Sequence, residues 1–181
     1  MDTSREKAWR ILTDHVKETS LLNHCRAVEI AMRAYAEKFG EDAEYWGAVG
    51  LLHDVDFEEY PEEHTKQTGN LLKPHDYTDQ FIIDIQSHAR DWGPERSRLQ
   101  KALLALDELT GFIIACSLVR PDKNLANVQV KSVMKKMKDK AFARAVNREN
   151  IIQGAVMLGI DLQEHIQFVT SALAKGYPQD L

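Results

Sequence analysis

The chain has 181 residues and a formal net charge of −5, with 44% hydrophobic and 28% charged residues. This length fits one domain with a sizeable core, and this composition is that of an ordinary soluble globular protein. The mild negative charge argues against a general nucleic-acid or membrane binder. The N-terminus lacks the layout of a signal peptide and no apolar stretch is long enough to cross a bilayer, so we expect a cytoplasmic protein without membrane attachment.

Helical periodicity runs through almost the whole chain, because apolar residues recur three and four positions apart and no segment reads as a convincing strand. The pattern predicts an all-α fold of about eight to nine helices. Asp42 is a suitable N-cap, Gly40 a suitable left-handed C-terminal residue, and Pro121 a helix stop. The helices are expected near residues 4–17, 20–39, 42–52, 61–73, 78–90, 94–119, 128–139, 147–158 and 161–175.

The two cysteines, Cys25 and Cys116, lie within apolar helical patterns. Neither has the spacing of a metal-binding or redox motif, and we interpret both as reduced thiols of the core. This interpretation agrees with a cytoplasmic location.

The most informative motif is His53-Asp54, which ends the apolar run 48–52. Imidazole and carboxylate groups suit divalent metals such as Mn, Fe, Co, Ni and Zn. The dipeptide alone is weak evidence, because His75-Asp76 is a second copy of it. The surroundings of each pair must decide between them.

Helical spacing shows which ionisable residues share a face with apolar ones. His24 lies between Leu21 and Val28, and Asp107 lies in line with Leu104 on an apolar helix. An unpaired buried carboxylate loses several kcal/mol of hydration. We therefore predict that Asp107 binds a metal, and a structural ion pair or a partly solvated position is the alternative.

The remaining histidines divide into two groups. His64 and His88 fall on apolar rows of their predicted helices and could reach an interior site. His15 and His165 pass the same test, yet we interpret them as core or partly buried histidines. His75 follows a proline in a predicted turn, and we expect it to be solvated.

The order of His24, His53-Asp54 and Asp107 resembles the His, His-Asp, Asp signature of the HD superfamily of metal-dependent phosphohydrolases, an all-helical group. The segments around His64 and His88 resemble those that supply extra histidines in HD proteins with two metals. The segments 107–111 and 142–149 are also similar to small stand-alone HD hydrolases. The resemblance thus covers nearly the whole chain, and it implies one HD domain over residues 1–181, with a metal-binding core at about 20–120 and a helical extension at 121–181.

The resemblance implies a metal-dependent hydrolase of a phosphate monoester or diester, with a nucleotide or another small phosphorylated metabolite as substrate. A metal-activated water would attack the phosphoryl group, with Asp54 and His53 as catalytic residues. One or two divalent ions are expected, and Mn, Fe, Co, Ni, Zn and Mg all stay open. The implied ligands of the first metal are His24, His53, Asp54 and Asp107, and those of the second are His64, His88 and a bridging Asp54.

One departure from the family pattern concerns residue 57. Many members follow His-Asp with Ile-Gly-Lys, or place a glutamate three residues after the aspartate, whereas this chain has Phe57 there. A proton donor must come from elsewhere, and Asp56, Glu58 and Glu59 are the nearby candidates.

The segment 131–148 holds seven basic residues and one acidic residue. Lys131, Lys135 and Lys138 share one helical face, so Lys135 could contact a substrate phosphate, although an ordinary solvated helix face explains the pattern as well. Arg90, two residues after His88, is an alternative phosphate contact.

Two other classes of function stay open. A non-catalytic HD-type sensor or interaction module, with a structural metal, would keep the scaffold without hydrolysing anything, and a purely structural metal domain would have no open coordination position. Nucleic-acid binding is least expected, because one basic helix in an acidic chain is a poor footprint. A homo-oligomer is compatible with the sequence.

Overall fold

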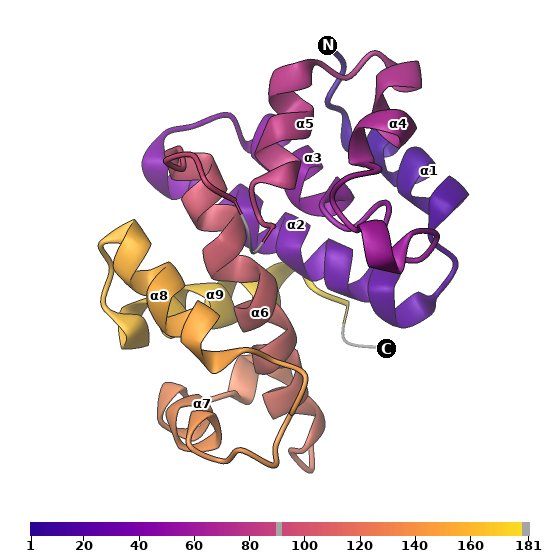
Figure 1. The fold of residues 1–181 in the computed structure, drawn as a ribbon. Helices are drawn as coiled ribbons and strands as arrows, with labels where there is room; N and C mark the ends of the chain where they lie inside the picture. The colour runs from indigo at the N-terminus through magenta and orange to yellow at the C-terminus, as the bar shows by residue number, and fades with distance from the viewer. Residues whose placement is uncertain (90–91, 179–181) are drawn as a thin grey trace. The chain divides into compact units, whose positions relative to one another are not determined.

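The structure, a computed structural model, describes residues 1–89 and 92–178 (Figure 1). Within these residues it contains nine α-helices, three short 3-10 helices and no strand, which confirms the predicted all-α class. None of the described helices is both long enough and apolar enough to span a membrane. The α-helices are α1 (Arg5–His15), α2 (Thr19–Phe39), α3 (Ala43–Leu52), α4 (Thr68–Leu72), α5 (Asp79–Gln86), α6 (Arg98–Leu118), α7 (Val130–Met137), α8 (Arg148–Leu158) and α9 (Leu162–Gly176), and the 3-10 helices are η1 (Pro61–Glu63), η2 (Lys73–His75) and η3 (Leu125–Asn127).

Helix boundaries follow the local capping chemistry. The side chain of Asp42 accepts hydrogen bonds from the backbone N–H groups of Glu44 and Tyr45, which starts α3 as predicted. Gly40 ends α2 with a left-handed φ of 71°. Thr78 caps α5 through its hydroxyl group. These caps fix where α2 ends and where α3 and α5 begin.

The predicted helix over 61–73 is wrong, because the structure replaces it with η1, a turn and the single-turn helix α4. Thr65 interrupts the segment with a φ of 68°, in the left-handed region that a helix cannot include. The side chains on either side, His64 and Thr68, both hydrogen-bond to the carboxylate of Asp56. This tertiary contact outweighs the local helical pattern.

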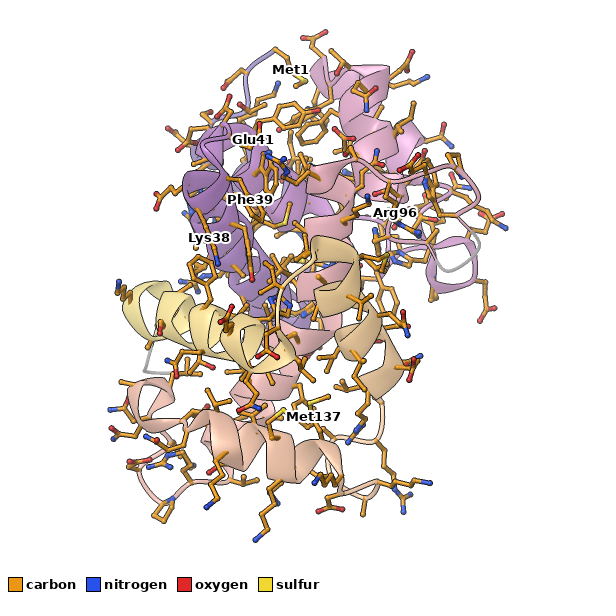
Figure 2. The ribbon with its side chains drawn as sticks, turned by 90° about the vertical axis from the view of Figure 1, so that its left-hand side faces the viewer. Met1, Lys38, Phe39, Glu41, Arg96 and Met137 are labelled. Carbon is orange, nitrogen blue, oxygen red and sulfur yellow. The ribbon has the colours of Figure 1, made fainter. Side chains whose placement is uncertain are left out.

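The helix predicted over 78–90 is too long, since α5 ends at Gln86 and His88 lies in the turn that follows. Arg96, labelled in Figure 2, fixes this turn from the next loop. Its Nε donates to the carbonyl of Ser87 over 3.0 Å, and its Nη2 donates to the carbonyl of Ala89 over 3.2 Å. His88 is therefore held by backbone contacts on both sides rather than by a helix.

The chain forms two compact units, residues 1–103 and 104–181, and the division falls within α6. In the first unit, α3 contacts α1, α2 and α5. In the second unit, α9 contacts η3, α7 and α8. The prediction of a single domain stays a prediction. Cys25 and Cys116, one in each unit, are free and buried, as predicted.

The helices α2 and α3 pack closely because small residues face α2. A Cβ atom added to Gly50 would lie 2.9 Å from Cγ of Met32 and 3.1 Å from the carbonyl oxygen of Val28. At the end of α2, the ring of Phe39, labelled in Figure 2, packs against those of Tyr35 and Trp46 at centroid distances of 5.4 and 6.1 Å. This packing brings the C-terminal end of α3 next to the N-terminal half of α2.

Candidate metal centre

Five of the predicted ligands meet within the first unit. His24 projects from α2, His53 ends α3, and Asp54 follows in the next turn. His64 lies directly after η1, and His88 lies in the turn after α5. Residues up to 64 positions apart in the chain thus form one cluster, which we call the His/Asp cluster. His53, Asp54 and His88 are buried, and His24 and His64 are half-buried.

The cluster contains two pairs of histidines, and within each pair the two Nε2 atoms face each other. The Nε2 atoms of His24 and His53 are 3.2 Å apart, and those of His64 and His88 are 3.0 Å apart. Two imidazole nitrogens bound at about 2.0–2.1 Å to one ion lie roughly 2.9–3.4 Å apart at octahedral or tetrahedral angles. Both separations match a pair of nitrogens that share one ion.

Backbone and side-chain acceptors fix the tautomers of three of these histidines. Nδ1 of His53 lies 2.8 Å from the carbonyl oxygen of Gly50, and Nδ1 of His88 lies 2.5 Å from that of Ile85. Nδ1 of His64 lies 2.8 Å from Oδ1 of Asp56. Each Nδ1 must therefore carry the proton that it donates, and in the neutral rings each Nε2 presents a lone pair to the cluster.

The facing lone pairs of His64 and His88 have a direct consequence. Two acceptors 3.0 Å apart repel each other unless a positive charge, either a proton or a metal ion, lies between them. Ligand atoms of Asp54, His64 and His88 all lie within 4.8 Å of one another, the spacing of a group able to hold a metal ion. The donor set of imidazole and carboxylate suits several divalent metals.

Asp54 lies between the two pairs and turns one oxygen to each. Its Oδ2 is 3.3 Å from Nε2 of His53 and 3.6 Å from Nε2 of His24. Its Oδ1 is 3.4 Å from Nε2 of His64 and 3.6 Å from Nε2 of His88. Burial opposes the ionisation of Asp54, but the charge of His53 and hydrogen bonds from His53 and His88, which these rings supply when they are protonated, outweigh it and hold the pKa of Asp54 well below its usual value.

Asp56, which the sequence suggests only as a candidate proton donor, orients His64. Its side chain is fully buried, Oδ1 accepts from Nδ1 of His64, and Oδ2 accepts from Oγ1 of Thr68 at 3.0 Å. Burial opposes its ionisation, but the hydrogen bond and charge of His64 lower the pKa of Asp56 overall. A buried carboxylate with both oxygens engaged is suited to holding an imidazole in place. The sequence carries no signal for this, since the pair spans an irregular loop.

The other two candidate proton donors lie on the surface. Glu59 pairs with His15, with 3.0 Å between Oε1 and Nδ1. Oε2 of Glu58 accepts the backbone N–H groups of Lys17 and Glu18, both at 2.9 Å, and these bonds lower the pKa of Glu58. The low pKa argues against Glu58 as an acid at neutral pH.

The three histidines expected to lie outside the metal site behave differently from the cluster. His165 is fully buried on α9, and its Nε2 donates to the carbonyl of Ala105 over 3.2 Å, which confirms a core histidine. His15 is half-buried, as predicted. His75, expected in a solvated turn, is half-buried in η2, and the pair His75-Asp76 belongs to no potential metal group among the described residues.

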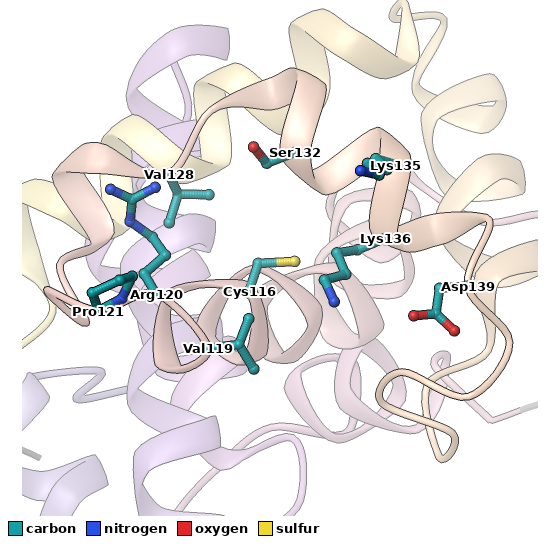
Figure 3. A pocket seen from close by; sticks show the side chains of 9 residues that line it. All are labelled: Cys116, Val119, Arg120, Pro121, Val128, Ser132, Lys135, Lys136 and Asp139. Atoms are coloured by element: carbon teal, nitrogen blue, oxygen red, sulfur yellow. The ribbon is translucent and has the colours of Figure 1, made fainter.

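Three further residues are predicted for the site from the sequence, namely Asp107, Arg90 and Lys135. Asp107 is a half-buried residue of α6 in the second unit, and its assignment as a ligand stays a prediction. Arg90 lies outside the described residues. Lys135 on α7 lines a cavity of about 380 Å³ in the second unit, together with Lys136 and Cys116 (Figure 3). Its role as a phosphate contact stays a prediction.

An open pocket of about 440 Å³ borders the His/Asp cluster in the first unit, and His24 is common to both. The pocket lies between the start of α2 and the loop that leads into η1. It is lined by Glu18, Ser20, Leu21, His24, Phe57, Glu58 and Pro61. This pocket gives the cluster a neighbouring space in which a small molecule could lie.

Comparisons of the chain with protein-family models, with curated proteins and with solved structures found no match. The geometry of the cluster therefore carries the functional interpretation.

Proposed function

We propose that the protein is a metal-dependent phosphohydrolase that acts on a small phosphorylated metabolite, with a binuclear metal centre built on the His/Asp cluster. The observation that carries the proposal is the position of Asp54 between two histidine pairs, with one carboxylate oxygen turned to each. A carboxylate in this position suits a bridge between two ions. His24 and His53 would hold the first ion, and His64 and His88 the second.

The resemblance of the sequence to the HD superfamily implies Asp107 as a further ligand of the first ion. The same resemblance implies the reaction class, hydrolysis of a phosphate ester. Divalent ions held there would supply positive charge toward a phosphoryl group and lower the pKa of a nearby water. The chain's own part is to present neutral Nε2 atoms, which the Nδ1 contacts of His53, His64 and His88 secure. Asp54 would keep its negative charge beside the ions, because positive charge next to it, which protonated histidines supply in their absence, holds its pKa well below the usual value.

The metal stoichiometry tests the binuclear arrangement. The purified protein is reconstituted with Mn, Fe, Co, Ni or Zn, and the bound metal per chain is measured by elemental analysis. We expect two ions in the wild type and one in the His64→Ala/His88→Ala double variant. His75→Ala/Asp76→Ala, which removes the second His-Asp pair, is the matched control and should keep two. One ion in the wild type, unchanged in the double variant, would exclude the second site.

Hydrolysis is tested separately with a panel of phosphorylated metabolites and the metal-loaded protein. We expect activity on at least one ester and its loss in Asp54→Ala, while Asp76→Ala retains it. Equal activity in Asp54→Ala would reject the catalytic assignment. Metal binding without activity on any ester would favour the alternative, a sensor or interaction module with a structural metal.

A further inference from the structure

The pocket beside His24 has an unusual charge for a site that would accept phosphorylated molecules. Two carboxylates, Glu18 and Glu58, line it, and its lining includes no lysine or arginine among the described residues. Glu58 is fixed in this position by two backbone N–H groups, and its lowered pKa keeps it ionised at neutral pH. The hydroxyl group of Ser20 donates to Oε1 of Glu18 at 3.1 Å, and both residues line the pocket.

The same pocket offers an apolar wall. Leu21, Pro61 and Phe57 line it, and Phe57 is 44% exposed although it is a large hydrophobic residue. The ring of Phe57 packs edge-on against that of His64, with centroids 5.1 Å apart, so an aromatic surface stands directly beside the His/Asp cluster. An exposed aromatic ring at a pocket is a suitable surface for stacking a planar group.

Charge and shape together restrict the molecule that fits. A phosphoryl group placed at the His/Asp cluster would leave its alcohol part in a pocket that is apolar on one wall and negative on another. A second phosphate or carboxylate there would meet Glu18 and Glu58 without a compensating cation in the described lining, which is unfavourable. A planar ring, uncharged or bearing hydrogen-bond donors, would stack on Phe57 and donate to the carboxylates.

We propose that the pocket selects phosphate monoesters whose alcohol part carries a planar ring and no second anionic group. This inference rests on the proposed phosphohydrolase function, because it places the phosphoryl group at the cluster. It adds what that function leaves open, namely the charge and shape of the leaving group. Phe57, the residue that departs from the family pattern, becomes a specificity-determining residue.

The charge selection is tested with the mono-, di- and triphosphate of one nucleoside, which differ only in their anionic groups, at constant free metal concentration. We expect the monophosphate to have a kcat/KM about fivefold or more above that of the triphosphate. Glu18→Lys should lower the ratio of the two kcat/KM values roughly two- to fivefold, which is the effect expected of one exposed charge pair. Glu62→Lys makes the same charge change on η1 outside the pocket and should leave the ratio unchanged.

The ring selection is tested with phenyl phosphate against ethyl phosphate. Phe57→Ala should lower kcat/KM for phenyl phosphate roughly three- to tenfold, the value of an aromatic contact, and leave ethyl phosphate nearly unchanged. Tyr60→Ala, which removes another exposed aromatic ring of the same loop from outside the pocket lining, is the matched control. Equal losses for both esters would overturn the ring selection.

These outcomes separate the inference from the function on which it rests. Hydrolysis that prefers the triphosphate, or a ratio that Glu18→Lys does not move, would overturn the inference and leave the phosphohydrolase intact. If no ester is hydrolysed, the proposed function fails. Calorimetric titration of the metal-loaded protein then still measures the affinity for each of the three nucleotides. Tightest binding of the triphosphate would overturn the charge selection.

Discussion

Nδ1 of His64 lies 2.8 Å from Oδ1 of Asp56, a carboxylate with no exposed surface. This contact turns Nε2 of His64 toward His88 and Asp54. It differs from the contacts of His53 and His88, whose Nδ1 atoms donate to backbone carbonyl groups. A carboxylate acceptor makes an imidazole more basic and fixes its orientation. His64 is therefore prepared as a ligand by a residue that would not touch the metal.

The first prediction concerns metal affinity in Asp56→Asn. The variant keeps an acceptor near His64 but loses the negative charge, so we expect the affinity for the second ion to fall by about 10- to 100-fold. The measurement is a competition titration with a chelator, followed by metal analysis. Asp76→Asn, which changes an exposed aspartate of the other His-Asp pair, should retain wild-type affinity. Equal affinity in Asp56→Asn and the wild type would show that the contact has no role in metal binding.

The second prediction concerns the close packing of α2 and α3. In Gly50→Ala the new methyl group would meet Met32 and the backbone of Val28, and overpacking of this kind costs about 1–3 kcal/mol. We expect a lower free energy of unfolding in urea and weaker metal binding, since the carbonyl of Gly50 also accepts from His53. Gly111→Ala on α6, where a Cβ atom meets nothing within 4 Å, is the control.

The two glycine variants should differ in their free energy of unfolding. The helix propensity of alanine favours the fold by roughly 1 kcal/mol at an open helical position, so Gly111→Ala should be neutral or stabilising. A Gly50→Ala protein as stable as Gly111→Ala would contradict the tight contact between α2 and α3.

The third prediction concerns thiol reactivity and its pH dependence. Burial raises the pKa of the Cys116 thiol from 9.0 to about 11, and burial also raises the pKa of Cys25. Because the thiolate is the reactive form, we expect neither cysteine of the folded protein to be alkylated appreciably by iodoacetamide at pH 8, whereas both react in urea. Mass spectrometry of the labelled protein counts the modified thiols, and rapid labelling of native Cys116 at pH 8 would contradict a buried thiol.

The raised pKa of Cys116 also determines how the free energy of unfolding changes with pH. The folded pKa of Cys116 exceeds the unfolded value, so the folded state holds the thiol proton more tightly. Its contribution to the free energy of unfolding is complete below about pH 9 and is lost as the pH rises toward 11. Cys116→Ser, measured alongside the wild type by urea denaturation, should show a flatter decline over this interval.

The sequence alone determined the helical class, most helix boundaries and the residues worth testing as ligands. Asp42 and Gly40 act within one or two turns of their own position, so their effects can be read locally. The apolar row around His24 likewise indicated that this residue faces inward. Such inferences succeed because helix capping and periodicity depend on neighbours in the chain.

Only the tertiary structure decided how the candidate ligands face one another. The helix predicted around His64 is broken at Thr65, and Asp56 reaches His64 and Thr68 across an irregular loop. His88 is placed by a turn that Arg96 holds, not by the helix before it. These contacts join residues without helical spacing, and their energies outweigh local propensity, so no pattern in the sequence encodes them. Both histidine pairs lie next to Asp54 only because α2, α3 and the two loops pack together.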